Sequence, residues 1–226
     1  MKSDKIMNSK IYHILDYIFR LIILNFLIFL ISLSFLIIIP YFNDSDLAYY
    51  LALIPTAFTF LPAIVSCFNV IKQYEEGNFH SIIKPFFKSF KKYYLKTVFI
   101  SFIIVIVAVL LNNSITVFYQ QIQNGLINLI GLILTLAIIF MMILALVHLP
   151  LVIVYFDDLK LIHYLKLSFL FAFKDLLLSF IMTIIIIIIF MLNFTWPHGM
   201  IFIGFSLPIY VLIKLSSKLY IKYSNN

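Results

Sequence analysis

Residues 126–156 read LINLIGLILTLAIIFMMILALVHLPLVIVYF, a run of 31 positions without one Asp, Glu, Lys or Arg. A helix that crosses the hydrocarbon core of a bilayer needs about 20 predominantly apolar residues. This run is longer than that, so it predicts a membrane-spanning helix that tilts or continues past the interface.

The composition of the whole chain agrees with a protein that has lipid as its main solvent. Of the 226 residues, 64% are hydrophobic and 11% are charged, whereas soluble domains are about 45–50% apolar and about 25% charged. A single cysteine, Cys67, excludes an intramolecular disulfide and a Cys-based metal site. We therefore expect one transmembrane domain over residues 1–226 and no separate soluble domain.

Five further apolar stretches extend the prediction to an all-α, polytopic helical bundle. The six predicted spans are residues 21–42, 47–71, 97–119, 126–156, 176–194 and 199–216. The sixth has the shortest uncharged run, from Met200 to Ile213, so a re-entrant segment is the alternative there.

Basic residues predict the orientation of these spans. All 16 Lys and Arg residues precede span one, lie between spans two and three or four and five, or lie at the end of span six or after it. The opposite side holds Asp44 and Asp46 and no basic residue. Positive charge stays on the cytoplasmic side during insertion, so both termini are expected in the cytoplasm. The net charge of +7 is explained in this way and does not indicate nucleic-acid binding.

The longest cytoplasmic loop predicts a basic, amphipathic elbow helix between spans two and three. Aromatic side chains share one face of it and lysines point away, as in helices that lie among anionic headgroups. Contact with a cytoplasmic partner is the alternative. The residues expected to make these contacts are Lys84, Phe86, Phe87, Lys88, Phe90, Lys91 and Lys92. Residues 161–174 resemble a fainter copy of this segment.

A Leu-Pro pair recurs in three of the spans, at Pro62, Pro150 and Pro208. The first two are followed by a basic segment and a returning helix, a pattern typical of a duplicated helical hairpin. Coincidence is the alternative, because proline is tolerated in membrane helices and leucine is abundant in them.

Four polar residues within spans lie toward the cytoplasmic side, namely Asn25, Ser66, Asn69 and His148. Polar side chains are costly inside a membrane, so they are the first candidates for function. If they face one another, they line a cavity open to the cytoplasm in which His148 binds a polar or anionic ligand. Alternatively, they bridge helices or satisfy backbone groups freed by nearby prolines.

Signatures of enzymes are absent from the sequence: it has no nucleophile elbow, phosphate-binding loop or His-Glu-x-x-His motif. The neighbouring carboxylates Glu75-Glu76 and Asp157-Asp158 lie where cytoplasmic loops begin and are interpreted as solvated residues. We therefore expect no catalytic residue, metal or cofactor.

Several short motifs resemble the YesL family of bacterial membrane proteins. They lie at residues 11–25, at Ile54-Pro55-Thr56-Ala57, at Val70-Ile71-Lys72, at Gly77, and at residues 86–94 with the sequence FFKSFKKYY. The resemblance implies a compact polytopic protein of the bacterial plasma membrane, of unassigned molecular function and often encoded beside carbohydrate ABC transporters. It implies no catalytic residues.

Three hypotheses for function follow. The first is a non-catalytic component that assists carbohydrate uptake or its regulation by contacting the permease subunits of an ABC transporter. The second is an independent small transporter that uses the polar cavity facing the cytoplasm. The third, which the lack of paired acid and base groups disfavours, is a membrane enzyme that acts on lipid.

Overall fold

The computed structural model describes residues 10–32, 46–77, 81–122, 125–196, 199 and 202–224, and the protein is all-helical over these residues. Its helices are α2 (Lys10–Ile31), α4 (Asp46–Glu75), α5 (Ile83–Gln120), α6 (Leu126–Tyr155), α7 (Leu161–Lys174), α8 (Leu176–Thr195) and α10 (Ser206–Ser224). The predicted all-α class is confirmed for this part of the chain.

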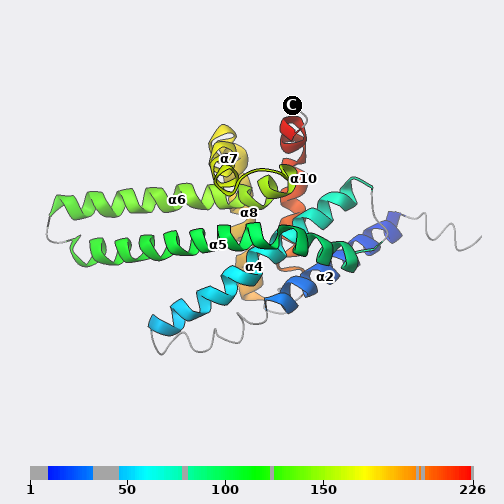
Figure 1. Ribbon diagram of the computed structural model, residues 1–226, viewed down its shortest axis with the longest axis horizontal. Helices are drawn as coiled ribbons and strands as arrows, with labels where there is room; N and C mark the ends of the chain where they lie inside the picture. The colour runs from blue at the N-terminus through cyan, green and yellow to red at the C-terminus, as the bar shows by residue number, and fades with distance from the viewer. Residues whose placement is uncertain are drawn as a thin grey trace, which may run out of the picture.

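The helices α5 and α6 lie side by side as an extended hairpin (Figure 1). Gly125 precedes α6 with φ +140°, a conformation that L side chains rarely adopt. Near the tip of the hairpin, a Cβ atom added to Gly131 would lie 2.6 Å from Cε1 of Phe118. Gly131 therefore allows the Phe118 ring to approach the α6 backbone closely.

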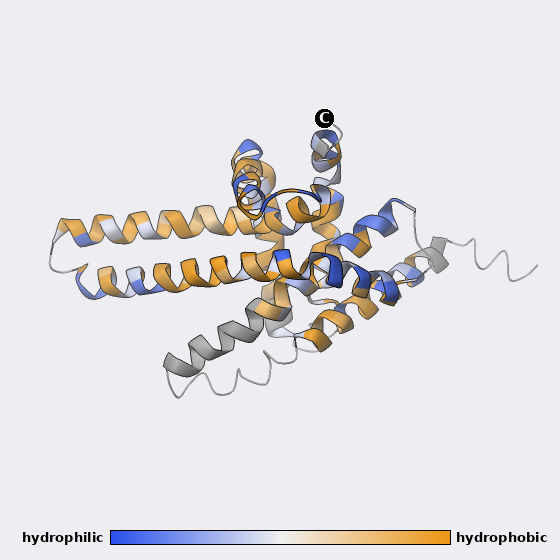
Figure 2. Ribbon diagram, viewed as in Figure 1, coloured by the Kyte–Doolittle hydropathy of each residue, from blue (hydrophilic) through white to orange (hydrophobic). Residues whose placement is uncertain are grey.

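Most of the ribbon of this hairpin has the colour of hydrophobic residues (Figure 2). Leu110 of α5 and Ile130 and Ile133 of α6 are all more than half exposed. Within the described residues, the helical segments Ile14–Ile31, Ile83–Gln120 and Leu126–Tyr155 are long and apolar enough to cross a membrane. Exposed apolar faces of this length are stable in lipid and not in water.

A fourth crossing is possible where α7 and α8 meet, because the two helices together pass the same criteria of length and composition. They are bent by 102°. Asp175 stands at the break, and its carboxylate accepts a hydrogen bond from the backbone N–H of Leu178 at 3.4 Å. An Asp that satisfies a free N–H of the first turn is a common helix start, so α8 begins anew at this residue.

The core lies where the remaining helices cross the base of the hairpin. Ile28 of α2, Cys67 of α4, Ile100 of α5, Leu151 of α6 and Ile213 of α10 are fully buried in one cluster. In Figure 1, α10 runs across the direction of the α5–α6 hairpin, and α2 and α4 lie obliquely to it. The helices therefore cross one another instead of forming a parallel bundle.

The boundaries of the predicted spans agree with the helices in the middle of the chain and differ at its ends. The predicted span 21–42 begins 11 residues after the true start of α2 at Lys10, and its positions 33–42 lie outside the described residues. The predicted span 199–216 is displaced, because α10 runs from Ser206 to Ser224. α10 retains Lys214 within the helix because this lysine pairs with Glu75 at the end of α4.

The predicted elbow forms the first turns of α5 and continues into the predicted third span without a break. Proline at position 85 does not interrupt it, because a proline in the first turn lacks only an N–H that has no partner within the helix. The fainter copy, α7, is the segment that forms a separate helix at an angle to the next one.

Candidate functional site

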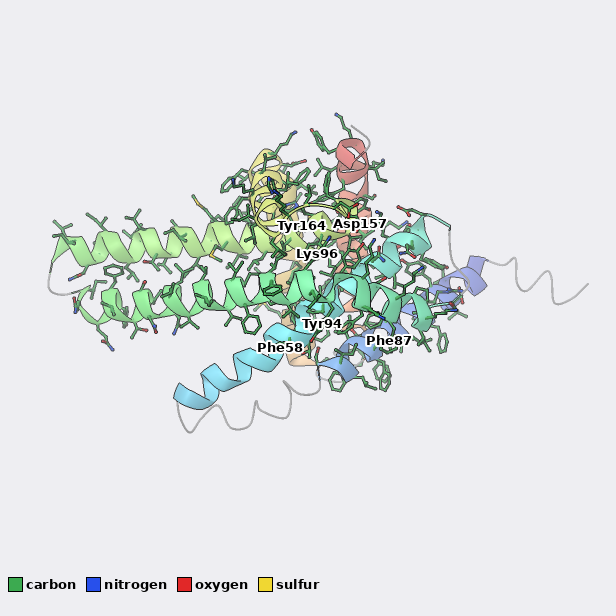
Figure 3. The ribbon with its side chains drawn as sticks, in the orientation of Figure 1. Phe58, Phe87, Tyr94, Lys96, Asp157 and Tyr164 are labelled. Carbon is green, nitrogen blue, oxygen red and sulfur yellow. The ribbon has the colours of Figure 1, made fainter. Side chains whose placement is uncertain are left out.

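Charged and polar side chains gather around the short loop that follows α6. The carboxylate of Asp157 accepts hydrogen bonds from Lys92 Nζ and, at 2.6 Å, from the hydroxyl of Tyr93. Its backbone carbonyl accepts from Lys96 Nζ at 2.8 Å and from the Tyr164 hydroxyl at 2.7 Å. Figure 3 shows Lys96, Asp157 and Tyr164 together where α5, the end of α6 and α7 meet.

These contacts change the acidity of Asp157. Partial burial by itself would raise the pKa of the carboxyl group, but hydrogen bonds from Lys92 and Tyr93 and the charges of Lys92 and Lys72 outweigh it and hold the pKa below its usual value. Asp157 was interpreted as a solvated loop residue. Its side chain is 42% exposed, and it joins α5 to the loop that connects α6 and α7.

Next to this junction is a cavity of about 390 Å³ between the end of α4 and the start of α5, here called the lysine pocket. The residues that line it are Asn69, Gln73, Ser81, Lys84, Pro85, Lys88, Ser89 and Lys92. A φ of +78° at Gly77 lets the chain turn directly after α4. The pocket thus combines Asn69 of the predicted polar cluster with three lysines of the predicted elbow.

The electrostatics of the lysine pocket favour an anion. Lys84, Lys88 and Lys92 follow one another at intervals of four residues, so they lie on one face of α5, and like charges at this spacing repel. The N-terminus of α5 adds the positive end of the helix dipole. No acidic residue is among the described residues that line the pocket. Lys92 is neutralised by Asp157, which leaves Lys84 and Lys88 without an ion pair among the described residues.

The aromatic face of the elbow differs from the prediction. Phe86 is fully buried and Phe90 is partly buried, whereas Phe87 is about half exposed. Ser89 and Tyr93, which were not predicted as contacts, complete the buried face together with Phe86. The lysines behave as expected: Lys84, Lys88, Lys91 and Lys92 are exposed. Most of the aromatic face therefore packs against protein, and among Phe86, Phe87 and Phe90 of the elbow, Phe87 is the side chain most available to lipid.

Of the four predicted polar residues, only Asn69 lines the lysine pocket. Asn69 donates a hydrogen bond from Nδ2 to Ser89 Oγ at 2.6 Å, which ties α4 to α5. Ser66 donates to the carbonyl oxygen of Pro62 within its own helix. Oδ1 of Asn25 accepts from the backbone N–H groups of Phe205 and Ser206 at 2.7 and 3.1 Å, so Asn25 holds the start of α10.

His148 joins three helices. Its Nδ1 is 2.6 Å from the hydroxyl of Tyr220 on α10, and its Nε2 is 2.7 Å from Oγ of Ser179 on α8. The single hydroxyl proton of Ser179 is directed to the backbone carbonyls of Ala172 and Asp175. These distances fit a neutral imidazole in which Ser179 accepts from Nε2–H and Nδ1 accepts from Tyr220, with the role of each ring nitrogen set by the tautomer. This arrangement matches the helix-bridging alternative for His148.

Sequence reasoning missed both partners of His148. Tyr220 lies beyond the predicted end of the sixth span, and Ser179 gave no signal because serine is common in membrane helices. Among the described residues, no group of three or more His, Cys, Asp or Glu side chains could hold a metal ion.

Comparison with known proteins adds no relative to this description. The chain matches no protein-family model, no curated protein and no solved structure. The fold itself defines the class: a helical membrane protein with several apolar helices long enough to span a bilayer. A lysine-lined pocket lies between the end of α4 and the start of α5, and the hydrogen bond from Asn69 to Ser89 joins these two helices in its wall.

Proposed function

We propose that this protein is a non-catalytic, multi-pass protein of the bacterial plasma membrane that acts through the lysine pocket and the adjoining turns of α5. The observation that supports the proposal is the exposed charge of Lys84 and Lys88, which has no ion pair in the described part of the chain, beside a cavity of about 390 Å³. Such a surface attracts anionic lipid headgroups or acidic segments of a protein. Its role would be accessory to carbohydrate uptake by an ABC transporter, in line with the resemblance to the YesL family.

The proposed topology has six crossings with both termini in the cytoplasm. It is supported by the way charged residues meet at one end of the molecule. Lys214 of α10 pairs with Glu75 at the end of α4, and the hydroxyl of Tyr17 on α2 donates to the same carboxylate at 3.2 Å. Arg20 pairs with Asp16 one turn away. An end that concentrates charge in this way fits the cytoplasmic interface.

Co-purification from native membranes tests the accessory role. The tagged protein is extracted in mild detergent, and the proteins that accompany it are quantified by mass spectrometry. We expect permease subunits of a carbohydrate transporter in near-stoichiometric amounts. The pocket variant is Lys84→Glu with Lys88→Glu, and the matched control is Lys166→Glu with Lys218→Glu, two exposed lysines that do not line the pocket.

The outcomes separate clearly. Recovery of the permease with wild type and with the control pair, and its loss with the pocket pair, supports the proposal. Equal recovery with both pairs means that the lysine pocket is not the contact. Recovery of the protein without permease subunits contradicts the accessory role altogether.

One observation favours a second function, that of an independent transporter. The volume of the lysine pocket is within the range of about 300–1,000 Å³ typical of small-molecule sites, and Asn69 and Gln73 add hydrogen-bonding groups to its lysines. Uptake of labelled sugar phosphates or other small anions into proteoliposomes that contain only this protein tests it. Flux that requires Lys84 and Lys88 would favour transport over an accessory role.

A further inference from the structure

The wall of the lysine pocket presents positive charge and neutral hydrogen-bonding groups to the same space. Lys84 and Lys88 are exposed and form no ion pair within the described part of the chain. They lie four residues apart, which is about 6 Å along the helix, so their side chains can approach one ligand from neighbouring turns. Gln73 of α4 lies in the same wall and makes no hydrogen bond to another described residue.

A phosphate group matches these features. Phosphate groups are anionic at pH 7 and present several oxygens that accept hydrogen bonds. The ammonium group of a lysine is a point charge with three donors, so two of them can bind different oxygens of one tetrahedral anion. The first turn of α5 contains no acidic residue that would repel such an anion.

A third lysine, Lys92, lies between the lysine pocket and the loop that follows α6. Its side chain is part of the pocket wall, and its Nζ pairs with the carboxylate of Asp157. The two side chains are 53% and 42% exposed, and ion pairs between groups exposed to this degree are weak. An anion in the pocket therefore competes with Asp157 for the same ammonium group.

We propose that the lysine pocket binds a phosphate group between Lys84 and Lys88, and that Asp157 lowers the affinity of this site by holding Lys92 away from the ligand. This inference rests on the proposed function, since it names the ligand class of the same pocket. The phosphate group belongs either to an anionic phospholipid or to a soluble molecule, because both present the same oxygens to the lysines.

Binding measurements on the purified, full-length protein test this proposal. In a mild, uncharged detergent, inorganic phosphate is titrated by isothermal calorimetry, and bound phosphatidylglycerol is counted by native mass spectrometry with phosphatidylcholine as the zwitterionic reference. We expect a single saturable site for at least one of these probes. Preference for phosphatidylglycerol without binding of inorganic phosphate identifies a lipid headgroup as the source, and the converse identifies a soluble phosphate.

Three variants separate the roles of the charges. Lys84→Gln with Lys88→Gln should weaken binding at least about tenfold, because it removes two charged hydrogen-bond donors. Asp157→Asn releases Lys92 and should tighten binding about two- to fivefold, the size of one exposed ion pair. The matched control is Asp158→Asn, which removes the same charge from the neighbouring residue, and Asp158 has no ion pair among the described residues. It should change the affinity less than about twofold.

Wild-type protein that binds neither probe overturns the proposal. So does unchanged affinity in the variant without Lys84 and Lys88, whose exposed positions allow it to fold. Equal affinities of Asp157→Asn and Asp158→Asn would show that Asp157 does not hold Lys92 away from the ligand.

These results are independent of the co-purification experiment. If the pocket binds no phosphate but its lysines are required to recover the permease, this inference fails and the proposed function stands. If the pocket binds phosphate and no permease is recovered, the accessory role fails and this inference stands.

Discussion

Replacing His148 with alanine removes the side chain that connects α6 to both α8 and α10. The imidazole is completely buried and makes one hydrogen bond to Tyr220 at 2.6 Å and one to Ser179 at 2.7 Å. The two partners are affected differently. Ser179 keeps the carbonyl oxygens of Ala172 and Asp175 as acceptors, whereas no other partner within the described residues remains for the hydroxyl of Tyr220.

The size of the effect follows from these contacts. Hydrogen bonds between membrane helices contribute about 0.6 kcal/mol on average and up to about 1.7 kcal/mol. A buried hydroxyl left without a partner costs about 1–3 kcal/mol. We therefore expect His148→Ala to lower the free energy of unfolding by about 2–4 kcal/mol. Tyr220→Phe alone should cost about 1–2 kcal/mol, because it leaves Nδ1 of His148 unpaired.

The double variant gives the decisive measurement. Once His148 is absent, Tyr220→Phe removes only an unpaired hydroxyl, so it should be neutral or stabilising in that background. Titration of the purified variants from mild detergent into SDS gives the free energy of unfolding, and the cycle should show a coupling of at least about 1 kcal/mol. Additive effects would refute the hydrogen bond. Loss of cellular function without any loss of stability would assign a ligand-binding role to His148 instead.

Three further predictions concern the remaining polar contacts and the topology. Asn25→Ala removes the acceptor for the backbone N–H of Ser206 and should cost about 1–2 kcal/mol in the same titration; a loss below about 0.5 kcal/mol would contradict the role of this residue. Asp157→Asn should cost on the order of 1 kcal/mol at pH 7, since the carboxylate is partly exposed. The pKa of Asp157 in the folded protein lies below its unfolded value of about 3.9, so this stabilisation is complete above about pH 5 and is lost as the pH falls through the folded pKa. If the difference in unfolding free energy between Asp157→Asn and wild type persists unchanged to pH 3, this prediction is wrong. A cysteine at position 114, introduced as Ser114→Cys in a Cys67→Ser background, should react with an impermeant thiol reagent added outside the cell, and labelling only from the cytoplasmic side would reverse the proposed topology.

Long apolar runs made the helical elements of the middle of the chain predictable. The predicted span 126–156 differs from α6 by one residue, and the predicted span 176–194 differs from α8 by one residue. An apolar run predicts a helix reliably because the backbone N–H and C=O groups of a segment exposed to lipid must bond to one another. Within a single segment, only a helix pairs all of them. The start of α10 was not predictable in this way, since it depends on Asn25, which lies 181 positions before Ser206 and accepts its N–H.

Burial in the elbow shows a second limit of the sequence. Its alternation of aromatic residues and lysines predicts an amphipathic helix, and the exposed lysines confirm that pattern. The pattern alone does not distinguish an apolar face that meets lipid from one that meets protein, because both environments favour the same side chains. Packing against protein buries Phe86 completely and leaves Phe87 about half exposed.

Composition and periodicity by themselves thus determined that this is a helical membrane protein, because the free energy of placing apolar side chains in lipid depends on the residues and hardly on their neighbours. The tertiary structure decided which polar groups meet. It paired His148 with Tyr220 and Ser179, and it placed Asn69 beside the lysines of α5. Hydrogen bonds and ion pairs act over a few ångströms between residues far apart in the chain, so they follow from how the helices cross and not from the order of the residues along them.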